Sequence, residues 1–336
     1  MTNEEIEKLK NEVGLQISEQ EYRDLKYPSY SLLSDIAKVG IENVDPNFRN
    51  KEIGDFDGVI FGKIVDGLVT ENKLPEDIVV IQKKPSGKAK DLIKILVSNL
   101  KFLPEPKDLL NEKNHEVIFK ACDAIKYLKD NTKRIAGLEN YTQYITELTN
   151  AKPDTTIVTK YIFEEAKRCS KILLAQYPFL TGKTNLRIIP QVKLLGNVNG
   201  IDVKGMLDFI LINDELKEII AYDLKTGSYN FSDFEQKGYL GWNYYIQCSL
   251  YYELLKSELS KHPIYKDYKL NEVFNFMYIG RFEKKPGTYM ITKSRLDVGF
   301  DGFISAIFNE TKNYVAKNFK GVNELLNEYK EKFLDS

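Results

Sequence analysis

Cysteine and histidine are scarce in this sequence, with three and two copies among 336 residues. Cys122, Cys169 and Cys248 lie far apart and form no C-x-x-C pair, which excludes a disulfide framework and a cysteine-rich zinc or iron–sulfur site. His115 and His262 stand in polar, surface-like contexts, so neither a Ser-His-Asp triad nor a histidine-rich metal site is indicated. The cysteine usage favours a reducing compartment.

An excess of charge of one sign is also absent. Lys and Arg (48) nearly balance Asp and Glu (49), and the net charge is -1. No global field therefore draws the molecule to a polyanion, and any such partner must be bound by local contacts. With 43% hydrophobic residues, 11 Pro and 20 Gly, the composition excludes disordered, proline-rich and collagen-like classes.

Long hydrophobic runs and a nucleotide-binding loop are missing as well. No stretch of about 18 apolar residues occurs, and the acidic start MTNEEIEKLKNEVG does not resemble a signal peptide. We therefore expect a cytoplasmic protein, bacterial or phage-encoded, with no membrane partner. The glycines of NVNG and DLKTG lack the G-x-x-x-x-G-K-[ST] spacing, so ATP is not an expected cofactor.

The chain is long enough for one large domain or two smaller ones. Near residue 186 the sequence changes from segments with helical periodicity to segments rich in Ile, Val, Leu and Tyr. Residues 1–185 are predicted to be mainly helical and to wrap the core. Within them we expect a start signal for a helix at Ser29 or Ser31 and a strand at 75–82. Helices are predicted at 32–40, 56–71, 91–100, 115–130 and 156–177.

Residues 186–290 are predicted to form the core of the protein. Strand-forming residues with turn signals at NVNG and INDEL predict three strands in meander order, followed by a helix over 236–259. The segments NEVFNFMYIGRF and GTYMITKSRL are two further strand candidates, and residues 291–336 are a C-terminal helical segment. The expected fold class is α/β, with a central mixed sheet, flanking helices and one integrated domain.

Charged residues interrupt two apolar strands of this core. Asp208 lies within GMLDFILI, and Asp223 and Lys225 lie within IIAYDLKTG. A hairpin turn centred between Glu215 and Leu216 would set Asp208 directly opposite Asp223. Their Cβ atoms would then lie about 4.5 to 5.5 Å apart, where like charges repel. A Mg²⁺ ion shared by the two carboxylates would remove this repulsion.

Lys225 lies on the same face as Asp223, about 6.6 Å further along the strand. In the helix that follows, Gln247 and Tyr251 are spaced four residues apart and share one face, which for this pair alone favours simple packing. The alternative for the charged residues is an exposed strand end, with Asp208 paired to a surface lysine. If the carboxylates repel, removal of either one is expected to leave the fold intact.

The segments GMLD, DLK and QCSLY, in this order and at these intervals, resemble the PD-(D/E)XK nuclease superfamily in its RecB/RecE-like exonuclease branch with a QxxxY motif. The resemblance is strongest over residues 186–256. It implies a restriction-endonuclease-like core and a deoxyribonuclease that depends on Mg²⁺ or Mn²⁺. Asp208, Asp223 and the Leu224 carbonyl would bind the metal, Lys225 would act on the attacking water, and Gln247 and Tyr251 would position Lys225 or the nucleotide.

A weaker resemblance covers the N-terminal part. YPSYSLLSDIAK is similar to the entry helix of RecE-like exonucleases, and FGKIVDGLV is similar to their G-x-x-x-H helix, with Asp66 at the histidine position. Asp66 is either a further metal ligand or a structural residue that pairs with a lysine or caps a helix. Gln191 stands where relatives often carry a carboxylate or amide. The iron–sulfur cysteines of some relatives are absent, so no cluster is expected.

The resemblance further implies an exonuclease that acts at DNA ends in recombination, repair or phage DNA metabolism. Its partners would be DNA, as double-stranded ends or a single strand, and a single-strand annealing or recombination protein; an oligomer is compatible with it. Lys83, Lys84, Lys88 and Lys90 could contact the phosphate backbone or form a solvated loop. Two alternatives stay open: a structure-specific endonuclease and a catalytically silent DNA-binding or assembly module of the same fold.

Overall fold

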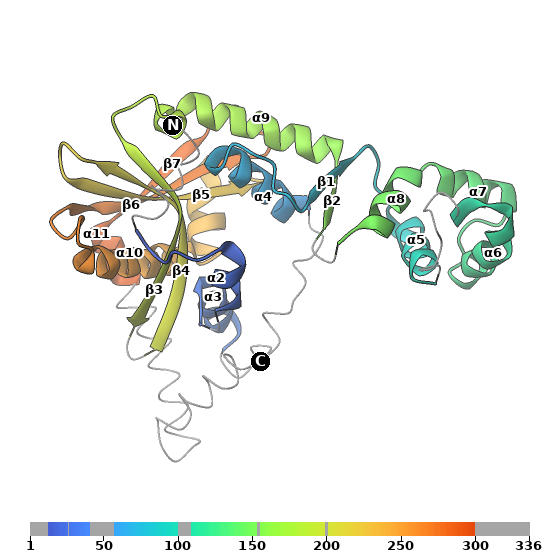
Figure 1. Ribbon diagram of the computed structural model, residues 1–336, viewed down its shortest axis with the longest axis horizontal. Helices are drawn as coiled ribbons and strands as arrows, with labels where there is room; N and C mark the ends of the chain where they lie inside the picture. The colour runs from blue at the N-terminus through green and yellow to red at the C-terminus, as the bar shows by residue number, and fades with distance from the viewer. Residues whose placement is uncertain are drawn as a thin grey trace, which may run out of the picture. The chain divides into compact units, whose positions relative to one another are not determined.

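The computed structural model describes residues 13–25, 27–40, 57–99, 109–152, 155–198 and 201–299. They form a mixed α/β fold, as expected, with a five-stranded and a two-stranded sheet (Figure 1). The chain divides into two compact units. The sheet unit comprises residues 1–54, 69–72 and 169–336, and the helical unit comprises residues 55–68 and 73–168. Among the described helices, none has the length and apolar character needed to cross a membrane.

The five-stranded sheet keeps the strands in chain order. The antiparallel pairs are β3 with β4, β4 with β5 and β6 with β7, whereas β5 and β6 are parallel. A parallel pair requires a crossover, and helix α10 (Tyr244–Lys261) provides it. The predicted meander and the two further strands are confirmed. The strands are β3 (Arg187–Val198), β4 (Ile201–Asn213), β5 (Glu218–Gly227), β6 (Lys269–Gly280) and β7 (Gly287–Thr292).

The hairpin of β4 and β5 has the predicted register. Phe209 pairs with Tyr222 and Ile212 pairs with Ile219. The rings of Phe209 and Tyr222 stack with centroids 5.2 Å apart. Because side chains alternate between faces along a strand, this register decides which residues of β4 and β5 meet on each face.

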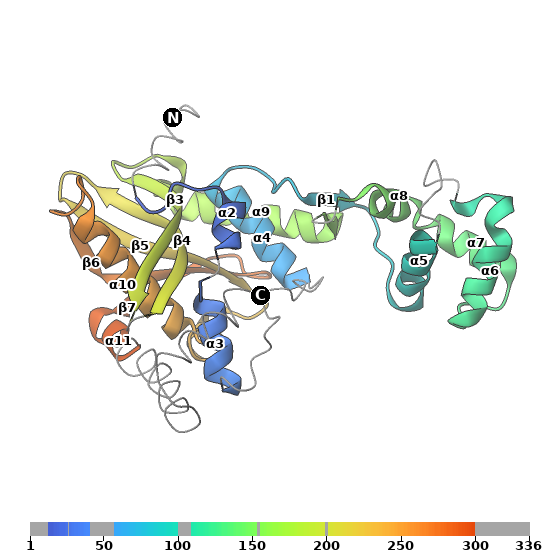
Figure 2. The same ribbon diagram turned by 60° about the horizontal axis from the view of Figure 1, so that its bottom comes forward.

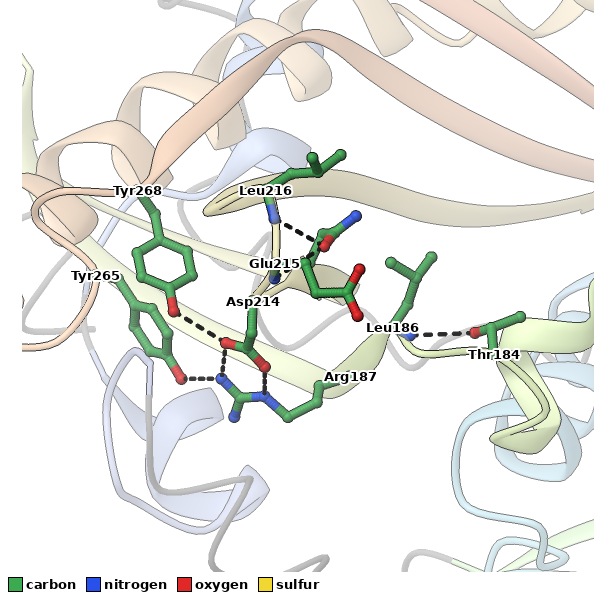
Figure 3. Close-up of polar contacts among 9 residues, drawn as sticks. Thr184, Leu186, Arg187, Asp214, Glu215, Leu216, Tyr265 and Tyr268 are labelled. Carbon is green, nitrogen blue, oxygen red and sulfur yellow. Dashed lines mark hydrogen bonds and ion pairs between the residues drawn. The ribbon is translucent and has the colours of Figure 1, made fainter.

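A polar cluster holds the turn of this hairpin (Figure 3). The Asn213 side-chain oxygen accepts two backbone N–H groups of the turn, each at 3.1 Å. Arg187 donates to both carboxylate oxygens of Asp214, at 2.6 and 2.9 Å. The hydroxyls of Tyr265 and Tyr268 lie 3.0 Å from Arg187 and Asp214, respectively. The cluster therefore ties the start of β3 and the segment before β6 to the turn.

Helix α10 packs closely on β3 and β4 because two glycines leave room for it. A Cβ atom on Gly205 would lie 2.8 Å from the Tyr251 ring, and one on Gly196 would lie 2.6 Å from the Leu254 side chain. Any larger residue at these positions would push the helix away from the sheet. This close approach brings the inward face of α10 against the face of β5 that carries Asp223.

The N-terminal helices α2 (Glu19–Asp24) and α3 (Tyr30–Val39) lie beside β3 and β4 in both views (Figures 1 and 2). Lys204 of β4 is 9% exposed, and its ammonium donates to the carbonyl oxygens of Tyr22, Arg23 and Leu25 at 2.7 to 3.0 Å. Ser29 precedes α3 as its N-cap residue, although its side chain makes no capping hydrogen bond.

The helical unit has its own apolar core, which includes Leu92, Ile93, Ile118, Leu138 and Ile145. Its two short strands pair in parallel. The last helix, α9, passes from this unit into the sheet unit between residues 168 and 169. The elements of this part are α4 (Asp57–Thr70), β1 (Ile78–Ile81), α5 (Gly87–Asn99), η4 (Glu112–Asn114), α6 (His115–Ala124), α7 (Asn131–Glu139), α8 (Thr142–Asn150), β2 (Thr156–Thr159) and α9 (Lys160–Gln176).

Four predicted boundaries are wrong, and one is the end of the helix predicted at 115–130, because α6 ends at Ala124. The helix predicted at 156–177 begins only at Lys160, because the β-branched residues before it pair with β1 as strand β2. The helix predicted at 236–259 begins at Tyr244, after the π-helix η7 (Phe234–Leu240) and the 3-10 helix η6 (Phe231–Asp233). The strand predicted at 287–296 ends at Thr292 and α11 (Lys293–Asp297) follows.

Three ranges that are predicted to be helical cannot be compared with the structure. The C-terminal helical segment beyond residue 299 and the predicted helical residues 1–12 and 41–50 lie outside the described residues.

Candidate active site

Asp208 of β4 and Asp223 of β5 each follow the last residue pair of the β4–β5 ladder, Phe209 with Tyr222. The same register continued by one residue would set the two carboxylates opposite each other. The hydrogen-bonded ladder ends there, and the Asp208 Oδ2 atom accepts the backbone N–H of Leu224 at 2.6 Å. A side chain thus takes the place of a strand-to-strand hydrogen bond at this position.

The Asp223 side chain is buried and hydrogen-bonded on both oxygens. It is 1% exposed, it forms an ion pair with Lys225, and its Oδ1 atom accepts the side-chain N–H of Gln247 at 3.1 Å. Burial raises the pKa of Asp223 above its ordinary value, and Lys225 opposes that rise. The lysine and the amide therefore compensate a carboxylate that the fold has removed from water.

Lys225 is held between carboxylates and aromatic rings. Its side chain is 15% exposed, and its ammonium lies 5.0 Å from the centre of the Tyr244 ring and 5.8 Å from that of Phe276. Burial by itself lowers the pKa of Lys225, but the charges of Asp223 and Asp208 outweigh it, and the pKa is raised. Lys225 is therefore an ammonium over the whole physiological pH range.

Helix α10 supplies a second layer of polar groups. Gln247 and Tyr251 both face the hairpin, as their spacing predicts. The Oε1 atom of Gln247 is buried and accepts no hydrogen bond from the described residues. Burial raises the pKa of Tyr251 to about 12, with Asp223 adding to the rise and Lys225 opposing it, so its phenol is neutral. Gln247 holds Asp223 directly, which its spacing alone did not show.

Gln191 flanks the pair from β3. It lies between the pairs formed by Pro190 with Phe209 and Val192 with Leu207, which places it across from Asp208. Its φ angle is +51°, in the left-handed region that non-glycine residues rarely adopt within a strand. Backbone strain of this kind costs about 1 to 3 kcal/mol and gathers at functional sites.

The oxygen atoms at this position fit a hard divalent cation. Asp208 and Asp223 offer carboxylate oxygens from two adjacent strands, and the Gln247 Oε1 atom is a buried acceptor next to them. Mg²⁺ and Mn²⁺ prefer such ligands and retain several waters. Within the part of the chain that the structure describes, no group of three or more His, Cys, Asp or Glu side chains gathers as a metal site. A cation here would thus be bound by two carboxylates, with the predicted Leu224 carbonyl and water.

The predicted ligand Asp66 lies on α4, in the helical unit, with its side chain partly buried. The structure describes the two units separately, so the assignment of Asp66 as a ligand stays a prediction.

The lysines predicted to contact nucleic acid have contacts within the helical unit. Lys84 donates to the Ile157 carbonyl at 3.2 Å, and Lys88 donates to the Lys126 carbonyl at 3.0 Å. Lys83 lies over the Tyr141 ring, with 5.0 Å between the ammonium and the ring centre. Lys90 is partly buried in α5. Their role in binding nucleic acid stays a prediction, and Lys84 also stabilises β2.

Two residues of this site were missed from the sequence, Tyr244 and Phe276. Tyr244 precedes Gln247 by three residues on the same helix, so helical periodicity alone could have placed it on the inward face. Phe276 pairs with Asp223 across the parallel strands β5 and β6. That pairing depends on the length of the crossover through α10, which leaves no local signal in the sequence.

Comparison with known proteins gives distant structural similarity. No protein-family profile and no curated protein matches this chain. A solved structure described as "Putative exonuclease" from Eubacterium rectale is 13% identical, with a TM-score of 0.38, and the alignment covers 88% of this chain and 86% of that one. The structure of SSO0001 is 16% identical, with a TM-score of 0.25, and the alignment covers 66% of this chain and 87% of that one. At these scores the function has to be argued from the site itself.

Proposed function

We propose that this protein is a metal-dependent nuclease that hydrolyses phosphodiester bonds in DNA. One observation supports the proposal: Asp208 and Asp223 lie on adjacent strands, and the charges of both act on the Lys225 ammonium, which forms an ion pair with Asp223. Burying two carboxylates and an ammonium in a sheet is costly even when they are paired, and an apolar strand would avoid that cost. A phosphodiester needs this combination, because a cation must offset the phosphate charge while a water attacks.

Asp208, Asp223 and the Leu224 carbonyl would hold Mg²⁺ or Mn²⁺. When bound, the metal would polarise a phosphoryl oxygen and lower the pKa of a coordinated water. Lys225, held as an ammonium, would donate a hydrogen bond to the oxygens on which charge develops. Gln247 would hold the Asp223 carboxylate through its side-chain N–H, and Tyr251, whose ring lies against Gly205 of β4, would position Lys225 or the nucleotide.

Of the two possible modes of cleavage, we propose exonucleolytic digestion from DNA ends in recombination, repair or phage DNA metabolism. This choice rests on the resemblance of the three motifs to RecE-like exonucleases. The same residues would equally serve a structure-specific endonuclease, and a protein that lost catalysis would still bind DNA. The test must therefore separate these three.

End-labelled linear DNA and closed circular DNA should be incubated with purified protein and Mg²⁺, Mn²⁺ or EDTA. An exonuclease degrades the linear DNA alone, an endonuclease also opens the circle, and a silent module cleaves neither.

The Asp208→Asn variant is expected to lose at least about 100-fold in rate, since it removes one metal ligand but leaves the ion pair of Asp223 and Lys225. Leu216→Ala, at the exposed hairpin tip, is the matched control and should cleave normally. Equal rates for Asp208→Asn and wild type would overturn the site assignment.

A further inference from the structure

The only tryptophan of the chain, Trp242, is solvent-exposed beside the candidate active site. Its exposed fraction is 55%, whereas most large aromatic residues of the sheet unit are buried in its core. It lies in the short turn between η7 and α10. Exposing an indole is unfavourable in water, so a function for this position is worth seeking.

The backbone that carries the indole is fixed by helix α3. The Tyr30 hydroxyl donates to the Trp242 carbonyl oxygen. The next residue, Asn243, has a φ of +59° and donates through its side chain to the backbone and hydroxyl oxygens of Ser34, at 3.3 and 3.2 Å. These contacts from α3 fix the backbone on which the indole is carried, which reduces the conformational entropy that a ligand would have to remove.

A lysine lies against the same ring. The Lys38 ammonium, on the exposed end of α3, is 5.3 Å from the centre of the Trp242 indole. An aromatic face next to a cation is the combination with which proteins bind single-stranded nucleic acid, because the ring stacks on a base and the cation contacts a phosphate. The molecule has a net charge of -1, so a nucleic acid must rely on such local contacts.

Two tyrosines link this pair to Lys225. Tyr244 follows Trp242 by two residues, and its ring contacts the Lys225 ammonium at 5.0 Å. The rings of Tyr244 and Tyr30 lie 6.4 Å apart, and Tyr30 is the residue that holds the Trp242 carbonyl. A strand whose phosphate reaches Lys225 would have a neighbouring nucleotide within reach of the indole.

We propose that Trp242 and Lys38 form a nucleotide subsite. The indole stacks on an unpaired base that flanks the scissile phosphate, and Lys38 contacts a phosphate of the same strand. The inference rests on the proposed nuclease function and adds to it a preference for single-stranded DNA next to the cleavage site. Because any base has a π face, the subsite would be tolerant of sequence.

The single tryptophan makes a direct test possible. In EDTA, where cleavage is blocked, the full-length protein should be titrated with a dT oligonucleotide while indole fluorescence is excited at wavelengths that tyrosine does not absorb. Binding is measured in parallel by the anisotropy of a fluorescein-labelled copy of the oligonucleotide. Stacking predicts that quenching and anisotropy follow one binding curve.

Variants of Trp242 and Lys38 test the stacking contact and the phosphate contact separately. Trp242→Ala should weaken binding about ten-fold, and Trp242→Phe, which keeps a ring, should restore most of it. Lys38→Ala should reduce the slope of log affinity against log salt by about 0.7, the value for one phosphate contact on a single strand. Leu216→Ala lies roughly 20 Å from Asp223 along the hairpin and should bind like wild type.

The outcomes separate this inference from the proposed function. If the oligonucleotide binds without quenching and with unchanged affinity for Trp242→Ala, the subsite is overturned, while cleavage with Mg²⁺ still decides the nuclease proposal. If no oligonucleotide binds in EDTA but DNA is cleaved with Mg²⁺, the subsite is again overturned and the nuclease proposal stands. Quenching together with weaker binding of Trp242→Ala, but with an unchanged salt slope for Lys38→Ala, supports the stacking contact and rejects the lysine contact.

Discussion

Asp223 and Lys225 form a buried ion pair, in which the charge of each opposes the effect of burial on the pKa of the other. The carboxylate is 1% exposed and the lysine 15%, so neither is fully hydrated. The sequence predicts two repelling carboxylates and an intact fold when either is removed. The structure changes that expectation for Asp223, because its nearest charge is the ammonium of Lys225 rather than Asp208.

We therefore predict that Asp223→Ala strongly destabilises the protein. Removing one partner of a buried pair leaves an uncompensated charge, which costs about 3 to 5 kcal/mol. Urea denaturation at neutral pH measures this loss.

The matched double variant Asp223→Ala with Lys225→Met removes both charges and should recover most of the stability. If the double variant is as unstable as Asp223→Ala alone, the loss comes from packing and the pair does not carry the effect.

At the residue scale, sequence reasoning identifies the site only in part. Asp208, Asp223 and Lys225 are found because charged residues within apolar strands are unusual. The partner of each charge is not found, because the ion pair, the Gln247 amide and the Tyr244 ring depend on how α10 packs on the sheet. The strained φ of Gln191 likewise depends on its position in the ladder and leaves no mark in its residue type.

The β4–β5 hairpin is the element that creates the site, and the ion pair of Arg187 and Asp214 stabilises its turn (Figure 3). Hydrogen bonds from Arg187, and secondarily Tyr268, outweigh the effect of burial and lower the pKa of Asp214. A carboxyl with a lowered pKa in the folded state stabilises the protein above its unfolded pKa, near 3.9, and this contribution is lost as the pH falls through the folded pKa.

Asp214→Asn should accordingly be less stable than wild type at pH 7, and the difference should shrink as the pH falls below about 4. The side chain of Asp214 is 45% exposed, so the effect at neutral pH should be modest, at most about 1 kcal/mol. Denaturation midpoints of both proteins across this pH range measure it. A difference that is independent of pH would assign the effect to packing of the turn.

Lys204 connects another element to the sheet. Its ammonium satisfies three carbonyl groups at the end of α2 and lies 4.9 Å from the centre of the Tyr22 ring. Lys204→Met would leave these carbonyls without their donor, and hydrogen bonds to a charged group each contribute about 1.5 to 3 kcal/mol. We expect faster backbone hydrogen exchange in α2.

The exposed Lys171→Met is the control for this variant, because it removes a lysine from α9 without touching α2. Equal exchange in α2 for both variants would show that Lys204 does not hold this helix.

At the element scale, local patterns predict strands and long helices well where neighbours in sequence are also neighbours in space. The meander is an example, since alternation and turn residues set its register. The strand β2 is missed because its partner β1 is distant in sequence. The apolar residues of β2 directly precede α9, so by sequence alone they resemble the first turn of that helix. The start of α10 is missed because the apolar pattern of η7 runs on into α10, and the positive φ of Asn243, which separates the two helices, cannot be read from its residue type.

At the scale of the whole molecule, the chain forms two units with separate cores, although the composition is compatible with one integrated domain. Sequence reasoning places Asp208, Asp223, Lys225 and Gln247 in one segment but does not separate the helical unit, because α4 and α9 each run across a unit boundary without a linker of distinct composition. The motifs and the only tryptophan belong to the same unit, so fluorescence of Trp242 reports unfolding of the sheet unit.

This placement gives a test of metal binding that does not depend on activity. A cation that binds Asp208 and Asp223 only in the folded hairpin should stabilise the sheet unit by about 2.7 kcal/mol at 100 times its dissociation constant. The melting temperature followed by Trp242 fluorescence should therefore be higher with Mg²⁺ or Mn²⁺ than with EDTA.

In the Asp208→Asn variant one ligand is lost, and the rise in melting temperature should largely disappear while the melting curve in EDTA stays close to wild type. Leu216→Ala should keep the full shift. Superimposable wild-type curves with and without Mn²⁺ would show that the paired carboxylates do not form a preformed metal site, because any ligand that binds the folded state alone must raise its stability.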